Sequence, residues 1–210
     1  MLRLFCNRLL ETLQCCPEQE PYPLSSTFKE DLKWILQFLP FYNGVQFINP
    51  PPTSSTPITI DACLTGCGGA YGTDIYFTSF PQYVIDQNLN ISELEMLNAV
   101  ISIKLWSKQL ANQTIVLQCD NAAAVSVIQT GRGRDPFLLA CAREIWTCTA
   151  QYHLVIHVEH IAGVNNTMAD ALSRYHTSSA SRLLVDNFIA QNDATVHIVS
   201  TNLFELSSVY

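Results

Sequence analysis

The middle of the chain alternates between short apolar runs and longer helical patterns, and this alternation limits the possible folds. Residues 58–71 form a strand pattern that contains three glycines, consistent with a hairpin into residues 74–80. Helical and strand patterns then take turns, at Glu93–Leu110, Ile115–Cys119, Asn121–Gln129, Phe137–Ala150, Leu154–Val158 and Thr167–Tyr175. Hairpin strands followed by alternating elements predict an α/β fold, a mixed sheet with helices packed on it.

Composition divides the rest of the chain into three further segments. Residues 1–49 have a helical pattern, at 2–13 and again at 27–39 after a proline-rich interruption, with Leu32, Ile35, Leu36 and Leu39 on one helical face. Residues 50–57 form a proline-rich linker. The tail, 176–210, has apolar patches but no clear period, and its role is not predicted. We expect the folded domain to span residues 58–175.

The chain has 210 residues and 48% hydrophobic content, enough for one core plus extensions. No apolar run reaches the roughly 18–20 residues of a membrane span. The apolar start is interrupted by Arg3 and Arg8, and no small-residue cleavage site follows, so no signal peptide is expected. We expect an intracellular protein, in the cytoplasm or nucleus, without a membrane partner.

Eight cysteines are scattered without any Cys-x-x-Cys pair, which favours reduced thiols that act as small hydrophobic residues. Strand alternation also argues against a metal site made of Cys63 and Cys119. If Asp61 and Asp120 point the same way, Cys63 shares the face of Asp61 and Cys119 takes the opposite one.

Four acidic residues from distant parts of the sequence carry the main functional signal. Asp61 and Asp120 end apolar runs, and Glu95 and Asp170 stand near the starts of helical patterns. A fold that brings them together would create a self-repelling cluster, which hard cations neutralise. Carboxylate oxygens suit Mg²⁺ or Mn²⁺, and two such ions are the usual means of hydrolysing a phosphodiester.

Each acid also has an ordinary structural interpretation. Asp61 can end a strand in a turn, and Asp120 can be an N-cap. Asp170 can belong to a capping box with Thr167, and Glu95 can be a first-turn acid favoured by the helix dipole. Glu93 competes with Glu95, because residues two apart on a helix face different directions. We favour Glu95, which precedes an apolar, small-residue run.

The segment from His160 to Arg174, HIAGVNNTMADALSR, resembles the last motif of the ribonuclease H domain in gypsy-like and DIRS-like retrotransposon reverse transcriptases. Three earlier segments are similar to other parts of that domain, in family order: Asp61–Tyr71, Leu94–Ala99 and Cys119–Asn121. The resemblance covers roughly Pro57–Tyr175. The segment from Phe28 to Gly44 also resembles the connection that precedes the domain in DIRS-like elements.

The resemblance implies a five-stranded mixed sheet with helices on both faces, preceded by a short helical segment. It also implies endonucleolytic cleavage of the RNA strand of RNA–DNA hybrids with two Mg²⁺ ions, for which Mn²⁺ can substitute. In the family pattern Asp61 and Asp170 hold one ion, and the other is held by Asp61, Glu95 and Asp120. The chain has no Asp-Asp pair of the kind polymerases use, so an upstream polymerase region is the expected partner.

The resemblance also suggests roles for four residues outside the acidic set. His160 matches a family histidine on a mobile loop that assists the attacking water or product release; the alternative is a strand-end histidine. Asn121 is placed to help bind the hybrid. Arg132 and Arg134 could contact phosphate, although a solvated turn explains them better.

The net charge of −7 is unusual for a nucleic-acid enzyme, because no basic stripe compensates for it. An alternative function is therefore a weak or inactive scaffold, a domesticated or fragmentary retroelement that binds protein or nucleic acid. Two related enzyme classes fit less well. Integrases need a late helical Glu, but Glu159 lies on a predicted strand, and proofreading exonucleases need an early Asp-x-Glu that Asp61 does not begin.

Overall fold

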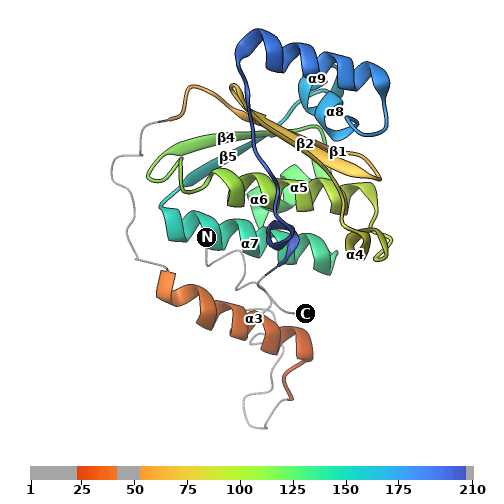
Figure 1. Ribbon diagram of the computed structural model, residues 1–210. Coiled ribbons are helices and arrows are strands. Elements are labelled where there is room, and N and C mark those ends of the chain that lie inside the picture. The colour runs from red at the N-terminus through yellow and green to blue at the C-terminus, as the bar shows by residue number, and fades with distance from the viewer. Residues whose placement is uncertain (1–22, 42–52, 207–210) are drawn as a thin grey trace.

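The computed structural model describes residues 23–41 and 53–206, and its centre is a mixed β-sheet covered on both faces (Figure 1). In the described residues the strand order is β5-β4-β1-β2-β3-β6. The strands are β1 Ile58–Ala62, β2 Gly66–Tyr71, β3 Asp74–Ser79, β4 Thr114–Cys119, β5 Val155–His160 and β6 Thr195–Val196. Strand β1 runs parallel to β4 and antiparallel to β2, β4 is parallel to β5, and β2 is antiparallel to β3.

Helices cover the two faces of this sheet unequally. On one face lie α5 Ile91–Trp106, α6 Ala122–Thr130 and α7 Pro136–Tyr152; on the other lie α8 Thr167–Ser173 and α9 Ser179–Asn192 (Figure 1). The predicted α/β class, mixed sheet and two-sided helix cover are confirmed. The order and direction of β1 to β5 are those of the ribonuclease H-like fold. In the described residues no helix is long and apolar enough to cross a membrane.

The sheet differs from the prediction in having a sixth strand, which comes from the tail. Strand β6 lies parallel to β3, where the backbone N–H of Thr195 donates to Thr73 and that of His197 donates to Ile75. Residues 179–206 also form α9 and the 3₁₀ turn η3, Thr201–Phe204. The tail therefore adds an edge strand and cover to both faces of the sheet.

The single strand predicted over residues 58–71 is also wrong, because the chain turns back between β1 and β2. The backbone N–H of Cys63 donates to the carbonyl of Gly66 at 2.8 Å and closes the turn. Leu64 stands at its tip, 69% exposed. The turn lacks a strong turn dipeptide, and its apolar residues read as a continuation of the strand.

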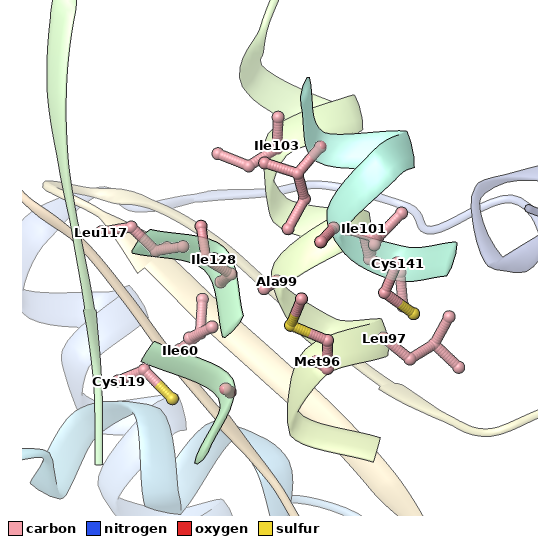
Figure 2. Packing of buried hydrophobic residues seen from close by; sticks show 14 of the residues in the cluster. Ile60, Met96, Leu97, Ala99, Ile101, Ile103, Leu117, Cys119, Ile128 and Cys141 are labelled. Carbon is pink, nitrogen blue, oxygen red and sulfur yellow. The ribbon is translucent and has the colours of Figure 1, made fainter. Parts of the chain in front are cut away.

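Helix α5 is the centre of the core. Eleven of its sixteen residues are buried, so it is covered on nearly every side rather than along a single apolar face. Figure 2 shows its side chains meeting Ile60 and Leu117 from the sheet, Ile128 from α6 and Cys141 from α7. The helix begins at Asn90 with a capping box completed by Glu93, so its first turn is fixed where Glu95 follows.

The opposite face has a much smaller apolar cluster, in which α8 lies directly on β2. A Cβ at Gly68 would lie 2.4 Å from the Cβ of Leu172, closer than real side chains approach. Glycine at this position is what lets α8 come so near the sheet. The buried members of the cluster are Ala70, Ile75, Ala171, Leu172 and Val185.

The described part of the first segment packs beside α7. Helix α3, Ser26–Phe38, is capped by Ser25 and followed by the turn η1, Leu39–Phe41. Its buried face carries Asp31, Trp34 and Phe38, and the Asp31 carboxylate forms an ion pair with Arg143 on α7. The predicted apolar face is therefore wrong, since Leu36 and Leu39 are exposed. The helix predicted over residues 2–13 lies outside the described residues.

Candidate active site

Four elements bring the four predicted acids to one cleft of about 500 Å³. Asp61 lies in β1, Glu95 in the second turn of α5, Asp120 directly after β4 and Asp170 in α8. Strands β1 and β4 are parallel neighbours, so their carboxyl ends meet at one edge of the sheet. The starts of α5 and α8 reach this edge from opposite faces. The described cleft is lined by Asp61, Ala62, Cys63, Leu64, Thr65, Ile91, Glu95, Asp120, Asp170, Arg174 and Thr177.

Asp61 is buried and held at both its backbone and its side chain. Its carboxylate accepts a hydrogen bond from the Ser173 hydroxyl, and its carbonyl oxygen accepts one from the Asn98 amide at 2.8 Å. Burial raises the pKa of Asp61 to about 6; the Ser173 hydrogen bond opposes that shift, while Asp120 and Asp170 add to it. The carboxylate therefore retains a proton more readily than an ordinary aspartate.

Glu95 is more deeply buried, with 3% of its surface exposed. One carboxyl oxygen accepts from the backbone N–H of Ala62 at 3.1 Å, and the other lies 3.9 Å from the Cys119 thiol. Burial, and then the charge of Asp61, raises the pKa of Glu95 to about 9. Glu93 instead accepts from the backbone N–H of Asn90 at 2.6 Å in the capping box. Glu95 therefore lines the cleft and Glu93 serves the helix start.

Asp120 is free of the capping role that its sequence position allowed. The N-cap of α6 is Asn121, whose side-chain oxygen accepts from the N–H groups of Ala123 and Ala124 at 3.0 and 3.1 Å. A Cβ at Gly163 would lie 3.1 Å from a carboxylate oxygen of Asp120. Glycine at 163 thus leaves room for the carboxylate to lie in the cleft.

Asp170 is likewise outside any capping box, since α8 has Asn166 at its N-cap without a side-chain capping bond. Its carboxylate accepts from Nε of Arg174 at 2.7 Å, and the two side chains are 47% and 51% exposed. The Asn166 amide donates to the carbonyl of Ile60 at 2.8 Å and ties the start of α8 to β1. Asp170 therefore faces solvent from a helix fixed at its base.

The donor set of the cleft fits a divalent cation. Ligand atoms of Glu95, Cys119 and Asp120 lie within 4.8 Å of one another, and the Asp61 carboxylate lines the same cleft. A cation would replace the proton that burial favours on Asp61 and Glu95, and carboxylate oxygens suit Mg²⁺ or Mn²⁺. The thiol of Cys63 donates to the Ser173 carbonyl on the α8 side. Cys119 contacts Glu95 of α5, so the predicted separation of the two cysteines is confirmed.

The other predicted site residues do not line the cleft. His160 ends β5 instead of lying on a loop, and its Nε2 is 3.0 Å from the carbonyl oxygen of Asp120. The Asn121 amide nitrogen donates to the Ser92 hydroxyl, so both ends of this side chain have structural partners. Arg132 and Arg134 are exposed in the connection between α6 and α7. Their functional roles stay predictions.

Sequence reasoning missed three side chains that hold or face the acids: Asn98, Ser173 and Arg174. Their spacing contains the signal, because residues three or four apart share a helix face. Asn98 follows Glu95 by three positions, and Ser173 and Arg174 follow Asp170 by three and four. Asn98 also donates to Gly68 and accepts from the Tyr76 hydroxyl at 2.5 Å. It thereby joins α5 to β1, β2 and β3.

Comparison with known proteins finds a likeness to a solved structure. No family model and no curated protein matches the chain. The chain is similar to the crystal structure of RNase H1 from the halophilic archaeon Halobacterium salinarum, with 12% identity and a TM-score of 0.45, over 57% of this chain and 95% of that one. A likeness at this level says nothing about activity, and the fold assignment rests on strand order and direction.

Proposed function

We propose that this chain is a metal-dependent ribonuclease H that hydrolyses the RNA strand of RNA–DNA hybrids as part of a retroelement reverse transcriptase. The observation that carries the proposal is the meeting of Asp61, Glu95, Asp120 and Asp170 in one cleft, from four separate elements. Three of their ordinary structural roles are filled by other residues: Asn121 caps α6, Asn90 and Glu93 cap α5, and Asn166 begins α8. The acids are therefore available for chemistry.

Two Mg²⁺ ions fit the proposed roles, one held by Asp61 and Asp170 and the other by Asp61, Glu95 and Asp120. When bound, such ions supply an activated water and stabilise the leaving 3′ oxygen, giving 5′-phosphate and 3′-hydroxyl products. The chain's own residues hold the acids in place. Ser173 and Asn98 fix Asp61, and the backbone N–H of Ala62 fixes Glu95. This support keeps the carboxylates converging despite their mutual repulsion.

Substrate binding is the weak part of the proposed enzyme. A chain with a net charge of −7 makes few phosphate contacts, so its affinity for a hybrid should be low and should fall with salt. Arg132 and Arg134 are exposed and can add contacts, and an upstream polymerase region would supply more. Fusing such a basic region should raise activity mainly by lowering KM. Tight hybrid binding by the unfused chain at physiological salt would contradict this explanation.

The same charge also favours the alternative of a catalytically inactive scaffold. The two functions differ in their response to Mg²⁺, because a scaffold gains nothing from an ion in the cleft. We expect Mg²⁺ to raise the melting temperature of the chain. An unchanged melting temperature at millimolar Mg²⁺, together with no cleavage, supports the scaffold.

The direct test is cleavage of a labelled RNA–DNA hybrid, with RNA–RNA and DNA–DNA duplexes as controls. We expect Mg²⁺-dependent cleavage of the hybrid's RNA strand alone. Asp120→Asn should abolish cleavage while leaving the melting temperature equal or slightly higher, because it removes charge repulsion and keeps the side chain's shape. Retained cleavage in both Asp120→Asn and Asp61→Asn would refute the two-metal proposal.

A further inference from the structure

Arg174 is the one cationic side chain among the described residues that line the cleft. Its Nε donates to Asp170 at 2.7 Å, and 51% of the side chain is exposed. Within the described part of the chain, its two terminal nitrogens donate no hydrogen bond. The Nε edge of the guanidinium thus binds the Asp170 carboxylate, while half of the Arg174 side chain faces solvent.

The charge around Arg174 gives it a second use. A nucleic-acid backbone that enters this cleft meets four carboxylates, so an anionic phosphate needs positive charge close to where it binds. Cations held by the acids supply part of that charge. A guanidinium matches phosphate oxygens with two parallel N–H donors, a geometry that a lysine cannot reproduce.

We infer that Arg174 is a phosphate-binding residue that alternates between two partners. In the ion-free cleft it is the counter-ion of Asp170. When a divalent cation takes the Asp170 carboxylate, the guanidinium is released and binds a phosphate oxygen of the nucleic acid. This inference rests on the proposed function, and it makes Arg174 a competitor of the cation and a ligand of the substrate.

The two roles predict opposite effects of one substitution. Arg174→Met removes the competitor, so Mg²⁺ should bind about threefold more tightly, as expected for a screened, half-exposed ion pair. The same variant loses the charged donor to phosphate, so hybrid should bind about tenfold more weakly. Mg²⁺ affinity is measured without nucleic acid, from the Mg²⁺ dependence of the melting temperature. Hybrid affinity is measured by fluorescence anisotropy at low salt, with Ca²⁺ in place of Mg²⁺.

Arg182→Met is the matched control. Arg182 lies on α9, with its guanidinium 5.6 Å from the Tyr175 ring centroid, and it does not line the cleft. Arg182→Met removes one positive charge from the same face of the sheet as Arg174→Met does. The two variants therefore share any long-range electrostatic effect. We expect both affinities to stay within about twofold of wild type for this control.

Arg174→Lys separates charge from shape and provides a second, milder variant. It should keep Mg²⁺ affinity near that of wild type and give intermediate hybrid affinity, since the point charge remains and the fork is lost. The inference is overturned if Arg174→Met weakens hybrid binding no more than Arg182→Met does, or if it fails to tighten Mg²⁺ binding. Neither measurement needs cleavage, so an absence of ribonuclease activity would refute the proposed function separately.

Discussion

The two faces of the sheet hold their acids in contrasting ways. On the α5 face, Glu95 is 3% exposed and surrounded by the large core that includes Met96 and Leu97. On the α8 face, the apolar cluster has five buried residues and Asp170 is 47% exposed beside Arg174. The buried acid is fixed before any ion arrives, whereas the exposed acid depends on a small helix and a solvated partner.

This contrast indicates which side of the cleft has a fixed geometry and which side can shift. The α5 side keeps its geometry at an electrostatic cost, which appears as the raised pKa of Glu95. The α8 side avoids that cost through exposure, but its position relies on close contacts such as that of Leu172 with Gly68. Substitutions on the α5 side should therefore change chemistry more than stability, and those at the α8 contact should change both.

The largest expected effect is on catalysis, from Glu95→Gln. We expect hydrolysis to fall by about three orders of magnitude, because a cation ligand worth several kcal/mol in the transition state is removed. The melting temperature of the ion-free chain at pH 7 should change little, since burial already keeps Glu95 protonated, with a pKa of about 9. Cleavage rates and melting curves of the same preparation measure both. If Glu95→Gln instead lowered stability strongly and left activity unchanged, the expectation that the α5 side affects chemistry more than stability would be wrong.

The second prediction concerns pH in the absence of divalent cations. The pKa of Asp61 rises from 3.8 to about 6 and that of Glu95 from 4.5 to about 9. Both shifts make the folded state bind protons more tightly than the unfolded state. Their stabilising contribution is thus complete below about pH 4 and is lost as pH rises towards 9. For Asp61 alone the change is on the order of 3 kcal/mol.

Urea unfolding in EDTA between pH 5 and pH 9 measures this slope. Glu95→Gln and Asp61→Asn should each flatten it, and saturating Mg²⁺ should oppose it, because the ion replaces the protons. A wild-type stability that rises steadily over this range would contradict the assigned burial of the two acids.

The third prediction tests the close packing on the α8 face with Gly68→Ala. The added Cβ would lie 2.4 Å from the Leu172 Cβ and 2.8 Å from its backbone carbon, so α8 must move away from β2. We expect a loss of about 2 kcal/mol in the free energy of unfolding and a tenfold or greater loss of activity as Asp170 shifts. Gly133→Ala is the control, since its Cβ would meet a Val127 methyl at 3.2 Å, away from the cleft. Equal activity in the two variants would show that α8 tolerates displacement.

The smallest effect is expected from Glu93→Gln, two residues from Glu95. It weakens the hydrogen bond to the Asn90 N–H but keeps a side-chain oxygen as acceptor. We expect a cost of about 0.5 kcal/mol in stability and activity within a few-fold of wild type. A loss of activity comparable to that of Glu95→Gln would exchange the roles of the two residues.

The sequence allowed the meeting of the four acids in one cleft to be predicted, because each acid stands beside a strong local pattern. Asp61 and Asp120 follow short apolar runs that are typical of buried strands. These two strands, β1 and β4, pair in parallel, so their carboxyl ends lie side by side. The support for those acids was not predictable in the same way. The spacing of Ser173 from Asp170 indicates only that the two residues share a face of α8. The hydroxyl of Ser173 reaches Asp61 across 112 positions, and no local pattern encodes that contact with a strand.

Local patterns also misled where tertiary packing decides the outcome. The turn at Leu64 carries apolar residues, so β1 and β2 read as one strand until Cys63 and Gly66 are seen to pair. Helix α9 buries only Val185, so its sequence has no clear helical spacing of apolar residues from which a helix could be predicted. Strand β6 has two residues and exists only because β3 offers an edge.

The path of the tail has a consequence for the order in which the molecule is assembled. Phe204, 5% exposed, packs against Phe80 with ring centroids 6.2 Å apart, and the Lys104 ammonium of α5 donates to the carbonyl of Glu205. A chain emerging from the ribosome therefore exposes part of the core beside Phe80 until residue 204 has been made. Contacts so distant in sequence are slow to form. We expect nascent chains halted at residue 194 to be more protease-sensitive than chains that include residue 206, which makes this a domain that closes late in its own synthesis.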